Sequence, residues 1–324
     1  MKSDWSSHNV FSTAQWAPSA TQNALRKRAD LVRSIRQFFD AREVLEVETP
    51  VLSQHATVDR HIESFQSGDG RWLQTSPEFA MKRLLCAGSG AIWQLCKSFR
   101  LEEAGRHHNP EFTMLEWYRP GFDHHALMDE VEALLRHCGA DASQKFERLS
   151  YREVFLSHAG FDPSQASISE MHECARHRSP PPPDDLGDVR DDWLDYFFGS
   201  IVSPALGQQR PCFVYDFPAS QAALARVRDE VAERFELIWR GVELANGFHE
   251  LADADEQAGR FERDLAWRRK HGRSAPPADT HLISALRAGL PDCAGVALGV
   301  DRLLMLLLDA PDLASTLAFD WSRA

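Results

Sequence analysis

Apolar positions near the start of the chain recur at helical spacing. Leu31, Ile35 and Phe39 stand four residues apart with charged residues between them, a pattern that predicts a long amphipathic helix. The apolar segment 44–51 follows, and Pro50 favours an extended chain that stops there. Taken alone, this helix and strand read as internal elements of a core.

A β-hairpin is predicted between positions 95 and 118. The first arm is apolar and ends at Arg100, and the loop is charged and contains glycine. A strand-end arginine can bind a phosphate through two N–H groups, and an aromatic ring can stack on a purine. An ordinary half-buried hairpin with a solvated loop explains the same pattern. Alternation places four side chains of the second arm on one face: Phe112, Met114, Glu116 and Tyr118.

The segment 72–86 predicts a strand followed by a helix. Residues 72–76 have strand character. Ser76, Pro77 and Glu78 then suit an N-cap, a first-turn proline and an early acid of a helix that runs to position 86. This structural role alone accounts for all three residues.

Residues 124–205 carry no chemical motif. Three helical patterns between positions 127 and 202 are interrupted by the proline run 180–183, which breaks any helix. A surface loop explains that run better than a site for a polyproline-binding partner. We expect a single domain over residues 1–324, with a mainly helical insertion at about 124–205.

Glutamates recur on a second predicted hairpin, 234–245. If its turn centres near Trp239 and Arg240, Glu236 and Glu243 face each other across the strands within about 5.5 Å at Cβ. Facing like charges destabilise a sheet unless a cation lies between them, and oxygen ligands suit Mg²⁺. A solvated acidic strand is the alternative.

The last third of the chain adds two helices, at 253–271 and 279–288, without a chemical signal. A small-residue strand then meets an apolar helix at Gly299, where glycine permits close backbone approach to a nucleotide. Glycines of this kind are weak evidence by themselves.

Composition favours a reduced, soluble enzyme. The 324 residues are 43% hydrophobic and carry a net charge of −12, which argues against a broad nucleic-acid-binding surface. Six cysteines show no zinc or disulfide spacing. No signal peptide and no run approaching ~18 apolar residues is present. We expect a cytoplasmic location.

Three segments, in order, resemble the signature motifs of class II aminoacyl-tRNA synthetases. Residues 42–52 are similar to motif 1, residues 99–113 to motif 2 and residues 295–302 to motif 3. Within that class, 76–78 and 243–251 resemble lysyl-tRNA synthetase catalytic domains and, more closely, their free-standing paralogues, the elongation factor P (R)-β-lysine ligases. The resemblance spans roughly residue 24 to the end.

The resemblance implies an α+β fold, the class II synthetase catalytic domain, with an antiparallel sheet of about six main strands flanked by helices. It implies a homodimer through motif 1. Lysyl-tRNA synthetases place an anticodon-binding domain before the catalytic domain, and no such domain is expected here.

The same resemblance implies ATP-dependent, Mg²⁺-dependent activation of (R)-β-lysine as its adenylate. Transfer to a lysine of elongation factor P would follow, without tRNA and without a membrane. A truncated lysyl-tRNA synthetase and a non-catalytic regulatory paralogue are the alternatives.

Site residues are carried over onto matching positions only. The resemblance assigns phosphate handling to Arg100 and Arg302, adenine stacking to Phe112, and Mg²⁺ to Glu236 and Glu243. It assigns further nucleotide contacts to Glu102, Asn109, Glu243, Leu244 and Gly299. It assigns the amino acid pocket to Ser76, Pro77, Glu78, Glu116, Tyr118, Asn246, Glu250 and Ala297.

Two positions depart from the residues found in related sequences. Leu101 stands where the family usually has Asn, so that polar contact is lost and we give Leu101 no role. Ala297 stands where lysyl-tRNA synthetases have Gly and the protein ligases have Ala. Its methyl group should narrow the amino acid pocket.

Overall fold

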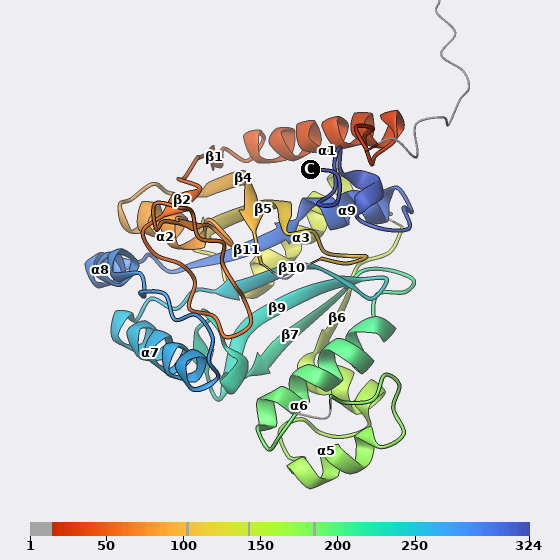
Figure 1. Cartoon of the computed structure of the whole chain (residues 1–324), viewed down its shortest axis with the longest axis vertical. Helices are drawn as coiled ribbons and strands as arrows, with labels where there is room; N and C mark the ends of the chain where they lie inside the picture. The colour runs from red at the N-terminus through yellow and green to blue at the C-terminus, as the bar shows by residue number, and fades with distance from the viewer. Residues whose placement is uncertain (1–14, 102–103, 142, 184–185) are drawn as a thin grey trace, which may run out of the picture.

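The computed structural model describes residues 15–101, 104–141, 143–183 and 186–324. Most strands of this part of the chain join one central sheet (Figure 1). Its strands are β1 (Leu45–Glu46), β4 (Ile92–Phe99), β5 (Glu111–Pro120), β6 (Glu147–Ser150), β7 (Cys212–Pro218), β8 (Val227–Arg228), β9 (Val231–Trp239), β10 (Val242–His249) and β11 (Cys293–Gly299). A separate small sheet pairs β2 (Leu52–Ser53) with β3 (Trp72–Leu73).

The main sheet runs in the order β1-β4-β5-β11-β10-β9-β7-β6, with β8 paired to β9. The six strands from β4 to β7 in this order are antiparallel. β1 and β6 add parallel edges. The expected α+β fold with about six antiparallel strands is therefore confirmed.

Helices cover the sheet, and most begin and end near predicted positions, but the helix Ile168–Ala175 lies where no helical pattern was predicted. Long helices are α1 (Gln22–Asp40), α3 (His124–His137) and α7 (Ala254–Lys270). Shorter ones are α2 (Glu78–Cys86), α4 (Tyr151–Val154), α5 (Ile168–Ala175), α6 (Arg190–Phe197), α8 (Thr280–Gly289) and α9 (Val300–Leu307). Among the described residues, no helix is long and apolar enough to cross a membrane.

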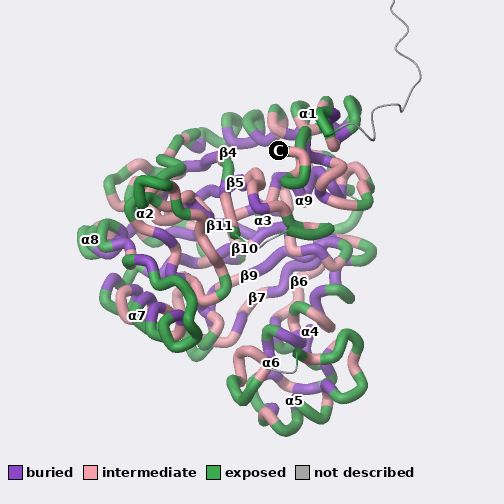
Figure 2. Tube along the Cα trace, in the orientation of Figure 1, coloured by how far each residue is buried: buried purple, intermediate pink, exposed green. Residues whose placement is uncertain are grey.

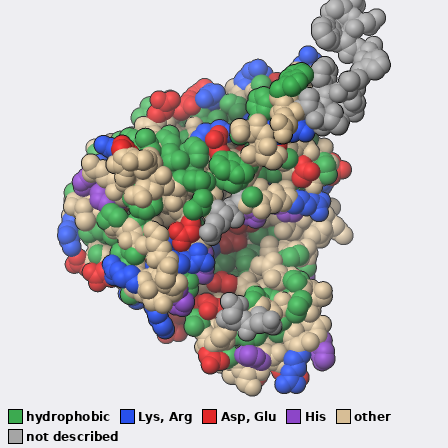
Figure 3. Space-filling view, viewed as in Figure 1, with side chains coloured by type: hydrophobic (Ala, Val, Ile, Leu, Met, Phe, Trp, Pro, Cys, Tyr) green, Lys and Arg blue, Asp and Glu red, His purple; other side chains and the backbone are tan. Residues whose placement is uncertain are grey.

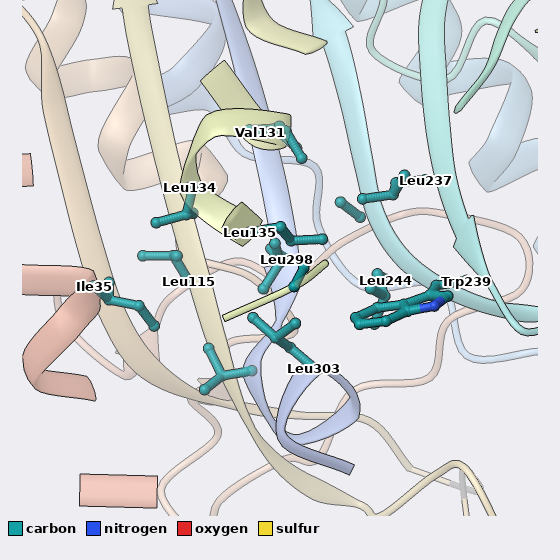
Figure 4. Close-up of a cluster of buried hydrophobic side chains, with 14 of the residues drawn as sticks. Ile35, Leu115, Val131, Leu134, Leu135, Leu237, Trp239, Leu244, Leu298 and Leu303 are labelled. Carbon is teal, nitrogen blue, oxygen red and sulfur yellow. The ribbon is translucent and has the colours of Figure 1, made fainter. Parts of the chain in front are cut away.

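The main core lies between the sheet and α1, α3 and α9. Leu115 of β5 and Leu298 of β11 pack against Leu134 and Leu135 of α3 and Leu303 of α9 (Figure 4). Full burial of each such side chain contributes about 1.5–3 kcal/mol. This packing holds one face of the sheet rigid and leaves the opposite face available for a site.

Two further apolar clusters complete the molecule. α2, α7 and α8 pack together over one end of the sheet, and α4 to α6 form a small lobe at the other end whose buried core is shared with β7 and β9 (Figures 1 and 2). Of the expected insertion, α3 joins the main core, whereas α4 to α6 make up the lobe. A recess separates the lobe from the sheet body, and acidic side chains gather along it (Figure 3).

Three local predictions need correction. The strand expected over 72–76 covers only Trp72–Leu73, and the extended segment 44–51 contributes only Leu45–Glu46 to the main sheet. The helix starts at Glu78, so Pro77 takes the N-cap position expected for Ser76. The Ser76 hydroxyl still accepts a hydrogen bond of 3.0 Å from the Glu78 amide.

Candidate active site

Strand register collects distant residues in one row across the open face of the sheet. Glu116 of β5 lies opposite Gln94 of β4 and Ala297 of β11, and Asn246 of β10 lies between Ala297 and Glu236 of β9. Directly opposed residues of antiparallel strands point to the same face. The row therefore unites three predicted amino acid-binding residues with one predicted metal ligand.

Hydrogen bonds tie the start of α2 to this row. The Ser76 hydroxyl donates to Glu116 Oε2 at 2.6 Å, and the Tyr118 hydroxyl donates to Glu116 Oε1 at 2.7 Å. Glu116 and Tyr118 are almost completely buried. Ser76, Glu116 and Tyr118, which the sequence places in one pocket, do lie together, and the orientation of the Glu116 carboxylate is fixed from both sides.

A buried lysine, which the sequence analysis did not identify, forms ion pairs with two further acids of the pocket. The Lys82 ammonium lies 2.6 Å from Glu78 Oε1 and 2.6 Å from Glu250 Oε2, and its side chain is 2% exposed. Its spacing of four residues from Glu78 on α2 is the one sequence signal for this ion pair.

The pocket destabilises the ionised forms of the Glu116 and Glu250 carboxylates, and their pKa values rise. Burial, with the added charge of Glu78, raises the pKa of Glu116 to about 8. Burial also raises the pKa of Glu250 to about 7, although the charge of Lys82 opposes the rise. Burial favours the neutral amine of Lys82, but the charges of Glu250 and Glu78 outweigh it and raise its pKa. Cationic groups of a ligand would relieve the repulsion among these carboxylates.

The hairpin loop and the start of α9 form the other end of the site. The Arg100 guanidinium lies 5.2 Å from the centre of the Phe112 ring. Arg302, two residues into the helix that follows Gly299, donates to the backbone carbonyl of Glu243 at 2.8 Å and of His107 at 3.1 Å. Gly299 lies opposite Met114, so the start of α9 is beside the strand that carries Phe112.

Asn109 has structural partners in this form of the protein. Its amide donates to the Glu111 carbonyl at 2.6 Å and accepts from the Trp321 amide at 2.9 Å. Asn109 therefore joins the hairpin loop to the end of the chain. Glu102, assigned to the nucleotide, lies outside the described residues.

Asp301 is a second residue whose role the sequence did not reveal. Its carboxylate accepts from the Thr113 amide at 2.7 Å and from Arg28 of α1. It is 2% exposed. One buried carboxylate thus joins the motif 2 and motif 3 segments to α1.

The predicted pairing of Glu236 with Glu243 is wrong in register. The turn uses Arg240 and Gly241, both with positive φ, so Glu243 lies opposite Ile238, and a bulge follows it. The two acids still interact, because burial and then the charge of Glu243 raise the pKa of Glu236 to about 8. Oxygen donors with this repulsion fit a divalent cation such as Mg²⁺.

Comparison with known proteins gives a matching family model and a set of similar proteins. Residues 11–322 match the family model of class II tRNA synthetases (D, K and N). A Yersinia enterocolitica protein named elongation factor P–(R)-beta-lysine ligase is 52% identical over 96% of this chain and 99% of its own length. Proteins with the same name from Pseudoalteromonas translucida and Vibrio cholerae are 51% and 48% identical, over 95% and 97% of this chain and 98% and 100% of their own.

Proposed function

Because the chain belongs to the class II tRNA synthetase family and matches elongation factor P (R)-β-lysine ligases over nearly its whole length, we propose that it performs their reaction. It activates (R)-β-lysine with ATP and ligates it to a lysine of elongation factor P. The observation that carries this proposal is the buried acidic pocket around Glu116.

The charge of the pocket suits a substrate with two amino groups. Glu78, Glu116 and Glu250 offer three carboxylates, and Lys82 supplies one internal cation. Two ammonium groups would restore the balance, which supports a diamino acid as substrate. Tyr118 and Ser76 hold Glu116 in place, and Asn246 and Ala297 form the adjacent part of the row.

Activation requires positioning and charge neutralisation rather than a covalent enzyme intermediate. The substrate carboxylate attacks the α-phosphorus of ATP in line, and pyrophosphate leaves. Arg100 and Arg302 bind phosphate oxygens, Phe112 stacks on adenine, and Asn109, Leu244 and Gly299 contact the nucleotide. Glu236 and Glu243 would hold Mg²⁺, which supplies charge neutralisation at the phosphates.

Transfer completes the reaction. The neutral amine of the acceptor lysine attacks the carbonyl carbon of the adenylate, an amide bond forms as the nitrogen loses a proton to water, and AMP leaves with the electron pair of the broken bond. Protein rather than tRNA is the proposed acceptor, and the net charge of −12 supports this choice.

A homodimer is also part of the proposal. Leu45, Val51 and Leu52 are large apolar residues of the motif 1 segment that are 56%, 37% and 40% exposed, and burial against a second copy would remove them from water. All six cysteines are free, which fits a cytoplasmic enzyme.

Intact-mass measurement tests the proposed function. The purified chain is incubated with elongation factor P, ATP, Mg²⁺ and (R)-β-lysine, and the acceptor should gain the mass of one β-lysyl group. An unchanged acceptor mass, with ATP consumed or not, would contradict the proposal.

A further inference from the structure

A second group of donor side chains lies on the opposite face of the sheet from the amino acid pocket. Glu233 is three residues from Glu236, and His249 is three from Asn246, so alternation directs both away from that pocket. They meet the first residue of α3, His124, beside an open pocket of about 710 Å³. The proposed reaction uses none of these three side chains.

The three residues present metal donors at short range. His124, Glu233 and His249 are 6%, 8% and 5% exposed, and one donor atom of each lies within 4.8 Å of the others. Neither ring nitrogen of His124 has a hydrogen-bond partner among the described residues, and Asp216 Oδ1 lies 3.4 Å from Nε2 without forming one. A buried imidazole in this state points to a missing ligand.

His249 is arranged as metal-binding histidines are. Its Nε2 lies 2.9 Å from Asp292 Oδ1, and its Nδ1 lies 2.6 Å from Glu233 Oε2. The contact between Nδ1 and Glu233 Oε2 has hydrogen-bond length, so a metal bound by both atoms would replace the proton between them and require the two atoms to move apart. A carboxylate on the outer nitrogen commonly orients a ligating imidazole.

The surrounding charges favour a dication. Arg226 contacts Asp292 and His249, and the Arg228 guanidinium lies 3.0 Å from Glu233 Oε1, while Glu233 Oε2 faces His249 and lies 3.8 Å from Arg226. The pocket is lined by two arginines but by five acids: Asp123, Asp216, Asp229, Glu233 and Asp292.

We propose that His124, Glu233 and His249 bind one divalent transition metal of the zinc class, with Asp216 close enough to serve as a fourth ligand. Two imidazoles and one carboxylate are a common zinc donor set. Because His249 directly precedes Glu250, the metal would fix the end of β10 beside the amino acid pocket. Another group, His55, Asp279 and His281, carries no proposal, because His281 is exposed and Asp279 Oδ1 already caps α8.

The test uses the full-length protein after removal of metal with a chelator. Equilibrium dialysis against Zn²⁺ and Co²⁺, followed by elemental analysis, should give one metal per chain, and Co²⁺ should show the visible bands of tetrahedral coordination. His124→Gln should abolish this binding, whereas the neighbouring His125→Gln and the distant His281→Gln should retain it.

A second, milder variant distinguishes loss of metal binding from misfolding. Asp292 has a side chain that is 67% exposed, so Asp292→Asn should fold, and loss of the outer carboxylate should weaken metal binding about 10- to 100-fold. Absence of stoichiometric metal in the parent protein would overturn the proposal. Equal affinity for Zn²⁺ in the parent, His124→Gln and Asp292→Asn would also overturn the proposal. Protonation of His249 without any metal binding would overturn it as well.

Discussion

The Lys82 ammonium lies 2.6 Å from the Glu250 carboxylate, and both side chains are almost completely buried. Lys82 also contacts Glu78, so one buried cation lies between two carboxylates of the pocket. Removing one partner of a buried pair typically costs about 3–5 kcal/mol, because a charge is left uncompensated. We therefore propose that the lysine is a positioning residue for the amino acid.

Lys82→Met should raise KM for (R)-β-lysine at pH 7 by at least about fivefold, because a further rise of one unit in the Glu250 pKa of about 7 lowers its ionised fraction at that pH by this factor. KM for ATP should change little. Parent KM should fall as pH rises from about 6 to 8.5, because Glu250 and Glu116, with pKa values of about 7 and 8, become ionised.

In the methionine variant this fall should move to higher pH, since the stabilising cation is lost. Lys82→Arg should restore part of the parent behaviour. Thermal unfolding of each variant separates folding loss from substrate affinity. A parent-like KM and pH profile in Lys82→Met would show that the lysine does not tune the pocket.

Ala297→Gly should relax selectivity toward α-lysine. Ala297 lies directly between Glu116 and Asn246, and the two amino acids place one ammonium group at different points along this row. One methyl group in a pocket is worth roughly 10- to 200-fold in selectivity. The measurement is kcat/KM for both amino acids, and an unchanged ratio would move discrimination to Ser76 or Glu78.

Gly295→Ala is the matched control on the same strand. A Cβ at 295 would collide with the Tyr118 ring and with Glu250 Oε1. This variant should lose activity toward both amino acids without a change in their ratio.

Arg100→Ala and Arg302→Ala should each reduce ATP–pyrophosphate exchange by about 10²- to 10³-fold, since each removes charge stabilisation at the phosphates. The exposed Arg33 of α1 provides the control, because its ion pair with Asp30 lies on the surface. Parent-like exchange in either variant, with a folded protein, would remove that arginine from the mechanism.

Glu236→Gln and Glu243→Gln should increase the Mg²⁺ concentration needed for half-maximal exchange, because each removes one charge from a shared cation site. Glu262→Gln, on the exposed side of α7, should leave the Mg²⁺ titration unchanged. Superimposable titrations of all four proteins would favour a strand whose acids bind no metal.

Local patterns predicted the elements of this fold well. Alternation along 111–118 identified β5 and its face because one side of that strand packs on α3. The periodicity of apolar residues predicted α1 for the same reason, because one side of that helix is buried. Register was harder, because a one-residue shift in the β9–β10 turn changed the partner of Glu243 from Glu236 to Ile238.

Residues that act through distant partners could not be inferred. Lys82 lies on a helix where lysine normally reaches solvent, and its burial depends on Glu250, which follows it by 168 positions in the sequence. The Arg28 contact with Asp301 joins the two ends of the chain in the same way. Such pairs follow from the packing of α1, α2 and the sheet, which no local pattern contains.

The proposed reaction requires a protein as acceptor of the activated amino acid. The most direct test offers labelled (R)-β-lysine, ATP and Mg²⁺ to the enzyme with elongation factor P and tRNA-Lys together, and follows label in each acceptor over time. We predict label in the protein and none above background in the tRNA. Charging of tRNA-Lys at a rate that rivals protein ligation would contradict the account.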